Sequence, residues 1–193
     1  EGKLVPLSAI RLTAQYLDVP RFNLTVESLS AKLPREDFAG LLLGEWPQLK
    51  LAAKQLNLHN FELVTPTLRI DSKAYPLILF QGAASSLKGA IDLNGQLNAR
   101  TWSAQVHALG CLDLVTLIPK EFTEKIPKIV FETLPYYELK LDFDDGFDLS
   151  HADLKAQVKA LRIDELTFDH VNAHASYANG LFVIEDLYLR RQQ

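Results

Sequence analysis

The sequence predicts a mainly β protein, with long antiparallel strands and two or three short helices. Apolar and polar residues alternate with a period of two along most of the chain, which is typical of strands with one buried face. One such stretch, residues 49–63, recurs 105 residues later as residues 154–168. Turn sequences such as Asp144-Asp145-Gly146 separate the alternating stretches and predict hairpins. These three observations favour one long, one-sided β surface.

The recurring stretch reads LKLAAKQLNLHNFEL in its first copy and LKAQVKALRIDELTF in its second. In both copies the alternation changes phase at the same two places, after Ala53 or Val158 and again after Leu58 or Ile163. A phase change requires an inserted residue, in either a bulge or a tight turn. Two copies with the same interruptions indicate one supersecondary unit that is used twice.

The N-terminal part of the chain predicts strands with one helix among them. Residues 10–19 and 22–33 alternate as two strands. Residues 34–43 begin with Pro-Arg-Glu-Asp, a pattern that is common at the first turn of a helix. We expect a short helix there, lying over one end of the sheet. Pro66 follows the first copy and predicts an edge strand or a turn.

Residues 77–99 carry apolar or small side chains at most odd positions and predict one long strand. Asn94-Gly95 is a common hairpin turn, but a turn there would set apolar against polar residues on both faces. A turn at residues 98–101 instead keeps the apolar residues on one face. Asn94-Gly95 then becomes a bulge or a gap of small residues within the strand.

The C-terminal part begins with a stretch that prolines interrupt. Residues 114–126 predict one or two short helices, and residues 119–135 contain three prolines. We expect residues 119–135 to connect a first β unit, residues 1–118, to a second one, residues 136–193. One continuous domain is the alternative at this chain length.

The composition excludes several classes of function. The formal net charge is −4, and Lys and Arg stand singly between apolar residues, unlike the basic cluster of a nucleic-acid binder. No run of about 18 apolar residues marks a membrane span, and no signal peptide is visible. The chain begins at Glu1 and contains no Met, which suggests a processed or excised piece of a longer protein.

Candidate chemical motifs are poorly spaced. His170 and His174 would share a strand face but lie about 13 Å apart, too far for one metal ion. The acids around Gly146 lack the spacing of a calcium loop and suit a hairpin turn. Ser85 and Ser86 lack the G-x-S-x-G frame of a nucleophile. We therefore predict no catalytic, cofactor-binding or metal-binding residues and no enzymatic activity.

The apolar stripe is the remaining functional candidate. It could be the inner face of a closed β-sandwich, which would make the chain a structural or protein-interaction domain. It could also be the inner face of an open, groove-like trough that binds acyl chains. Long strands with few turns at the roughly 8–12-residue spacing of a small sandwich favour the trough. The residues predicted to face lipid are Leu56, Leu58, Phe61 and Leu63, with their copies Leu161, Ile163, Leu166 and Phe168.

Three stretches carry a resemblance to a known family. The run L-x-L-x-A-x-x-L-x-L-x-x-F-x-L at residues 49–63, the alternating residues 84–97 and the motif Gly110-x-Leu112-Asp113-Leu114 resemble the AsmA/TamB/YdbH group of bacterial envelope proteins. Residues 171–190, a strand, an Ala-Asn-Gly turn and a second strand, are similar to the C-terminal AsmA-like segment. The motifs are loose alternation patterns, and the helices predicted at 34–43 and 114–126 depart from a continuous groove.

The resemblance implies a curved, taco-like β-groove with a role in phospholipid transport between membranes or in outer-membrane biogenesis. It implies a periplasmic location in the bacterial cell envelope, with an inner-membrane anchor outside this chain. The implied partners are phospholipid or another acyl-chain ligand and other segments of the same longer protein. No nucleic acid and no cofactor are expected.

Overall fold

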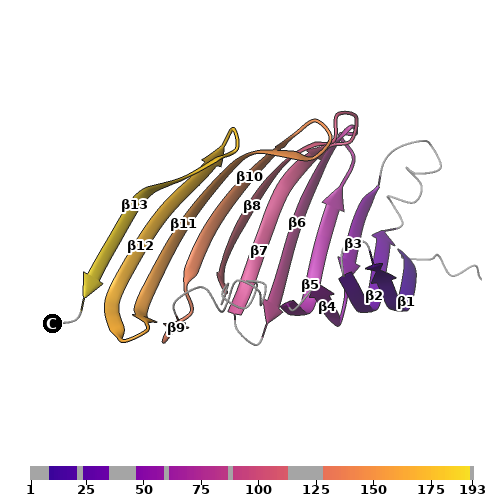
Figure 1. Cartoon of the computed structure of the whole chain (residues 1–193). Helices are drawn as coiled ribbons and strands as arrows, with labels where there is room; N and C mark the ends of the chain where they lie inside the picture. Colours follow the sequence, from indigo (N-terminus) through magenta and orange to yellow (C-terminus); the bar gives the residue numbers. More distant parts are fainter. Residues whose placement is uncertain are drawn as a thin grey trace, which may run out of the picture.

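The computed structural model describes residues 9–20, 24–34, 47–58, 61–86, 89–112 and 128–191 of the chain. The described residues form one 13-stranded sheet in which paired strands are antiparallel. Figure 1 shows the strands side by side in one wide, curved layer, with β1 at one end and β13 at the other. The mainly β, antiparallel fold expected from the alternation is therefore confirmed.

The sheet follows the chain as a meander. Its order is β1-β2-β3-β5-β6-β7-β8-β10-β11-β12-β13, while β4 pairs with β2 and β5, and β9 pairs with β11. The first eight strands are β1 (Ala9–Val19), β2 (Leu24–Pro34), β3 (Gln48–Ala52), β4 (Gln55–Leu58), β5 (Phe61–Asp71), β6 (Leu77–Ser86), β7 (Gly89–Asn98) and β8 (Ser103–Leu112). The others are β9 (Ile129–Phe131), β10 (Tyr136–Asp144), β11 (Asp148–Ile163), β12 (Leu166–Ala178) and β13 (Leu181–Arg191).

Register gives the sheet one apolar and one polar face. Gly82 pairs with Leu93 on the apolar face, and the adjacent pair, Gln81 with Asn94, lies on the polar face. Because the described strands make a single layer, few apolar side chains are enclosed on all sides. The buried ones in the described ranges are Val26, Ala104, Ala108, Pro135, Val158, Leu161, Val171 and Ala175.

The prediction of one strand over residues 77–99 is wrong, because two strands, β6 and β7, occupy this stretch. Ser86 and Gly89 face each other across the turn between them. Apolar residues occur on both parities of β6, including Leu79, whose side chain is 46% exposed on the polar face. The odd positions of β6 and of β7 therefore lie on opposite faces. The turn expected at residues 98–101 is confirmed, because β7 ends at Asn98.

The structure also tests what the sequence predicted for Pro66 in β5 and for Asn94-Gly95 in β7. Pro66 lies inside the central strand β5 and not at an edge or a turn. It sits where the register between β5 and β6 shifts, and a bulge tolerates the missing N–H. Asn94 and Gly95 lie within β7 without a register shift, and the ring of Phe80 fills the space beside Gly95, where a Cβ would lie 2.4 Å from its Cζ.

The helices expected at residues 34–43 and 114–126 fall almost wholly outside the described residues, although Pro34 itself ends β2. Within the described ranges, no helix is long and apolar enough to cross a membrane. The expected connector, residues 119–135, contains β9, which pairs with β11 in the common sheet. All described strands on either side of it belong to that sheet.

The repeat extends well beyond fifteen residues. Leu56 pairs with Leu63 across one hairpin, and Leu161 pairs with Phe168, 105 residues later, across another. The same offset of 105 residues relates three further pairs. In repeat 1 they are Leu24 with Leu58, Leu51 with Leu68, and Leu68 with Gly82. In repeat 2 the equivalent pairs are Ile129 with Ile163, Ala156 with Ala173, and Ala173 with Leu187. We call residues 24–86 repeat 1 and residues 129–191 repeat 2.

Both interruptions predicted in the repeated stretch are present in the structure. In repeat 1 the N–H of Ala53 donates to the carbonyl of Pro66 over 3.0 Å, and β3 gives way to β4. In repeat 2 the strand β11 continues, and its pairing with β12 is interrupted at Ala160, which has a φ of 55°, without a change of register. The second interruption is the hairpin turn that precedes Phe61 or Leu166.

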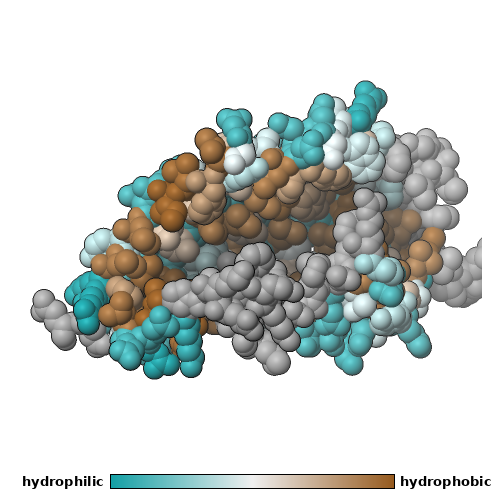
Figure 2. All heavy atoms as spheres, viewed as in Figure 1, coloured by the Kyte–Doolittle hydropathy of each residue, from teal (hydrophilic) through white to brown (hydrophobic). Residues whose placement is uncertain are grey.

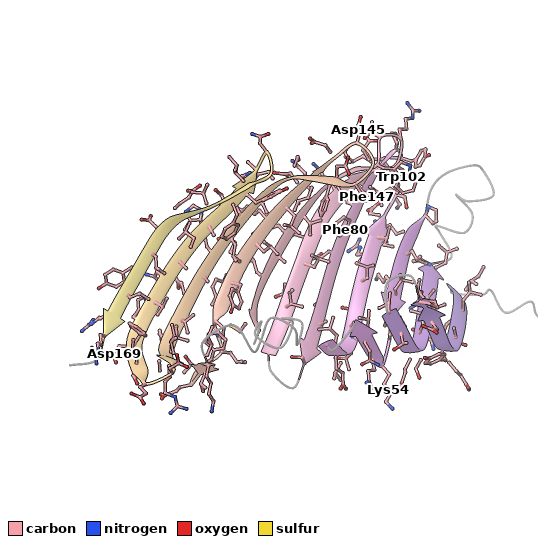
Figure 3. All side chains as sticks on the ribbon, viewed as in Figure 1. Lys54, Phe80, Trp102, Asp145, Phe147 and Asp169 are labelled. Atoms are coloured by element: carbon pink, nitrogen blue, oxygen red, sulfur yellow. The ribbon has the colours of Figure 1, made fainter. Side chains whose placement is uncertain are left out.

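The two repeats lie in one orientation within the sheet. Figure 3 shows Lys54 of repeat 1 and Asp169 of repeat 2 at the same end of the strands. Trp102, Asp145 and Phe147 lie at the opposite end, where the rings of Trp102 and Phe147 are 5.7 Å apart. The hairpin ends of both repeats therefore lie along one margin of the sheet, which we call the hairpin margin.

Candidate functional site

The apolar face of the sheet is the candidate site. Figure 2 shows apolar side chains gathered over the middle of the visible, hollowed face, with hydrophilic residues along its margins. The exposure continues to the last strand, where Phe182 is 66% exposed and Ile184 is 61% exposed. Exposed apolar surface of this extent marks an interaction or ligand-binding surface in most proteins.

A hollow of about 420 Å³ lies on this face in repeat 1. Its volume falls within the range of roughly 300–1,000 Å³ that is common for small-molecule sites. Thr67 is the single polar residue among the described residues that line it. The lining residues are Leu17, Val26, Leu29, Leu51, Ala52, Ala53, Leu56, Leu63, Pro66, Thr67, Leu68, Gly82, Ala83, Ala84, Ile91 and Leu93.

Small residues create the hollow. Gly82 and Ala84 of β6 leave space between the larger side chains of β5 and β7. A Cβ at Gly82 would lie 3.0 Å from the carbonyl oxygen of Thr67 and 3.3 Å from Cδ1 of Leu68, so even a methyl group there would be tight. A volume with apolar walls holds water poorly and favours apolar ligands.

The lipid-facing residues predicted from the first copy lie at this hollow as far as they are described. Leu56 and Leu63 face each other across β4 and β5, and both line it. The side chains of Leu58 and Phe61 lie outside the described residues. The predicted contact with lipid is not tested by this placement and stays a prediction.

The predicted residues of the second copy occupy a different environment. Leu161 is only 6% exposed and belongs to a core cluster with Val158 and Val171. Ile163 and Phe168 pack against this cluster together with Ile129 and Phe131, whereas Leu166 is 45% exposed. In repeat 2, most of these side chains therefore pack against one another.

The polar face carries rows of charges at matching register. In and beside repeat 1, four cations stand directly opposite one another on β1, β2, β3 and β5, namely Arg11, Lys32, Lys50 and Arg69. The ion pairs found among the described residues involve none of these four. The corresponding row of repeat 2 contains both acidic and basic residues, with Glu138, Lys155, His174 and Asp186 directly opposite one another.

Hydrogen bonds lower the pKa of two carboxyl groups of repeat 2, one in its row of charges and one beside that row. Nε2 of His174 lies 2.6 Å from Oδ2 of Asp153, and this hydrogen bond lowers the pKa of Asp153. Hydrogen bonds from Lys140 and His107 lower the pKa of Glu138. Both shifts hold the carboxylates in their charged form, as expected for ion pairs on a solvated face.

His170 and His174, which are four residues apart, contact different partners. His174 contacts Asp153, and the ring of His170 packs 6.5 Å from the ring of Tyr188. Among the described residues, no group of three His, Cys, Asp or Glu side chains could hold a metal ion. The hollow on the apolar face can bury hydrocarbon, and Thr67 is the single polar side chain among the described residues that line it.

No family model, no curated protein and no solved structure matches this chain. The site is therefore interpreted from its own geometry.

Proposed function

We propose that this chain is a non-enzymatic, lipid-contacting β-groove module, which binds the acyl chain of a phospholipid or a related amphiphile. The observation that carries the proposal is the apolar hollow of about 420 Å³ on an open sheet face. Each methylene group buried there contributes about 0.8 kcal/mol, so a long acyl chain gains enough to offset its loss of freedom.

The resemblance to AsmA-like envelope proteins gives this module a biological setting. In that setting the chain is part of a longer periplasmic protein that takes part in phospholipid transport or outer-membrane biogenesis. The edges of the sheet support this view, because β1 and β13 end the strand order and do not pair with each other. An open sheet of this kind can be continued by further strands of the same protein.

Native mass spectrometry of the purified chain, with lipid extraction, tests the proposal. We expect co-purifying phospholipid or fatty acid at a defined stoichiometry. Leu63→Asp places a charge in the hollow and is expected to lower lipid occupancy severalfold, because a buried unpaired charge is costly. Gln81→Asp places the same charge on the polar face and is expected to leave occupancy unchanged. A lipid-free wild-type chain that takes up no acyl probe would contradict the proposal.

One observation favours a second candidate function, strand addition at β13. The described strands form one sheet, so they do not build the closed sandwich that was the alternative expectation. An interaction role can instead use the edge of β13, whose residues are exposed along their whole length. In repeat 1 the corresponding strand, β6, is covered by β7.

Sedimentation tests whether a second copy covers this edge. We expect concentration-dependent oligomers of the wild-type chain, because an unpaired edge strand accepts another strand. Val183→Lys should shift the equilibrium towards monomers, because an edge lysine opposes strand addition. A chain that stays monomeric at every accessible concentration would contradict strand addition between copies.

A further inference from the structure

The core cluster of repeat 2 can be compared, position by position, with the hollow of repeat 1. The core cluster of repeat 2 consists of Val158, Leu161 and Val171 with Ile129, Phe131, Ile163 and Phe168 packed against it. Shifting these seven positions back by 105 residues gives Leu24, Val26, Ala53, Leu56, Leu58, Leu63 and Pro66. The side chain of Leu58 is not described, and five of the other six positions, all except Leu24, line the hollow of repeat 1. The same register positions therefore form a core cluster in one repeat and the wall of a hollow in the other.

Three side-chain differences account for this contrast. Phe131, Val158 and Phe168 of repeat 2 replace the smaller Val26, Ala53 and Leu63 of repeat 1.

The other two shared wall positions differ little in size, with Leu161 for Leu56 and Val171 for Pro66. Their burial differs nevertheless. Leu161 and Val171 are each 6% exposed, whereas Leu56 and Pro66 are only half-buried. The added rings and methyl groups of repeat 2 thus occupy space that repeat 1 leaves open.

The adjoining strand shows the same difference. Gly82 of β6 corresponds to Leu187 of β13, because both pair with equivalent residues of the preceding strand. Larger residues of repeat 1, such as Leu51 and Leu68, replace Ala156 and Ala173 farther from the hairpin margin. These leucines line the hollow as its walls. The exchange of large and small residues therefore places the open volume beside the hairpin margin of repeat 1.

We propose that repeat 1 alone holds one acyl chain, in the hollow walled by Val26, Ala53, Leu56, Leu63 and Pro66, and that repeat 2 is closed to it by its own side chains. The inference rests on the proposed function and restricts the acyl-chain site from the whole apolar face to the hollow of repeat 1. The occupant has the chemistry of the groups that fill repeat 2, which is hydrocarbon without polar atoms. A flexible acyl chain meets this requirement, whether it belongs to a free fatty acid or to a phospholipid.

Exchange of residues between the repeats tests the proposal. A filled variant, Val26→Phe/Ala53→Val/Leu63→Phe, gives repeat 1 the side chains that repeat 2 already carries at the same register. An opened variant, Phe131→Val/Val158→Ala/Phe168→Leu, makes the reverse change. Ala90→Val is the control, because it adds the same atoms as Ala53→Val on an exposed position of the polar face. A fluorescent long-chain fatty acid is the probe, titrated into each purified chain.

We expect one probe per wild-type chain, and affinity weakened at least about tenfold, or ~1.4 kcal/mol, in the filled variant. The opened variant should bind a second probe, the variant with both changes should bind one, and Ala90→Val should match the wild type. Displacement of the probe by unlabelled fatty acid or by phosphatidylglycerol vesicles then distinguishes the two sources of the acyl chain.

Two results would overturn the inference, and they separate it from the proposed function. Unchanged affinity in a folded filled variant would show that the chain binds elsewhere on the face, and the groove function would stand. No binding by the wild-type chain would remove both. The opened variant loses core contacts and can fail to fold, so circular dichroism accompanies each titration. Phe168→Leu alone is the milder substitute, with a weak second site as the expected result.

Discussion

Repeats 1 and 2 pair their strands in the same register beside the hairpin margin and differ in the side chains that fill the space there. Leu56 faces Leu63 as Leu161 faces Phe168, yet the first pair lines a hollow and the second belongs to a packed cluster. Register is set by backbone pairing and bulges, whereas the open volume is set by side-chain size. A duplicated β unit can therefore keep its pairing while one copy supplies stability and the other supplies a site.

The polar faces differ in a parallel way. Lys32, Lys50 and Arg69 of repeat 1 form a row of cations with Arg11 of β1, whereas in repeat 2 Lys155, at the position of Lys50, lies opposite the acidic Glu138. Like charges directly opposite each other destabilise a sheet, and opposite charges stabilise it. In repeat 2 the core cluster packs on the apolar face and Lys155 lies opposite Glu138 on the polar face, whereas repeat 1 has a hollow on one face and a row of cations on the other.

The largest expected difference is in the cost of removing the matched leucines. Leu161→Ala should lower the free energy of unfolding by about 2–5 kcal/mol, because the side chain is buried in the cluster. Leu56→Ala, at the same register position, should cost no more than about half as much, because that side chain is only partly buried. Urea denaturation of both variants measures the two values, and equal losses would contradict the contrast between a packed and a hollow repeat.

The charge rows predict effects of opposite sign. Lys50→Glu should stabilise the chain by about 0.2–1 kcal/mol, because Lys50 lies between Lys32 and Arg69. Lys155→Glu should destabilise it by a similar amount, because Lys155 pairs with Glu138. Thermal unfolding at low and at high salt measures both effects, and both should shrink at high salt. Two changes of the same sign would refute the comparison of the rows.

The smallest expected effect concerns pH. His174 and Asp153 correspond to Arg69 and Gln48, whose Nη2 and Oε1 lie 3.0 Å apart in a contact without an ionisable acid. Because the pKa of Asp153 is lowered from its ordinary value of 3.8, its carboxylate adds stability above that pH. That stability is lost as the pH falls through the lowered value. The scale is ~0.2–1 kcal/mol, as for exposed ion pairs.

Asp153→Gln gives repeat 2 the residue of repeat 1 and isolates this contribution. The difference in unfolding free energy between the wild type and the variant should be largest near neutral pH and should shrink below pH 3.8. Urea denaturation at several pH values measures the difference. A difference that grows on acidification would contradict the sign.

Much of the sheet could be predicted because alternation reports directly which side of a strand is buried. The repeat and both of its interruptions were visible in residues 49–63 and 154–168. Its full extent was missed, although LTVESL at residues 24–29 and IVFETL at residues 129–134 share the same pattern. One additional residue before β10 breaks the constant offset, since Ala31 pairs with Leu51 whereas Tyr137, and not Tyr136, pairs with Ala156.

The parts that failed depend on information that alternation does not contain. Leu79 and Phe80 are both apolar, so parity in β6 is ambiguous, and residues 87–88 carry no Asn-Gly or Asp-Gly to mark a turn. The hollow could not be located either, because it arises where Val26, Ala53 and Leu63 meet the small residues of β6. Such a volume depends on several strands packed together, and no single stretch encodes it.

The central claim is that an acyl chain lies over the hairpin end of repeat 1 and is excluded from repeat 2. A crystal structure of the chain with a fatty acid brominated along its tail tests this most directly, because anomalous scattering locates bromine without interpretation of the chain. We predict bromine peaks beside Leu56 and Leu63 and none beside Leu161 and Phe168. Peaks over the core cluster of repeat 2, or spread evenly along the apolar face, would contradict the account.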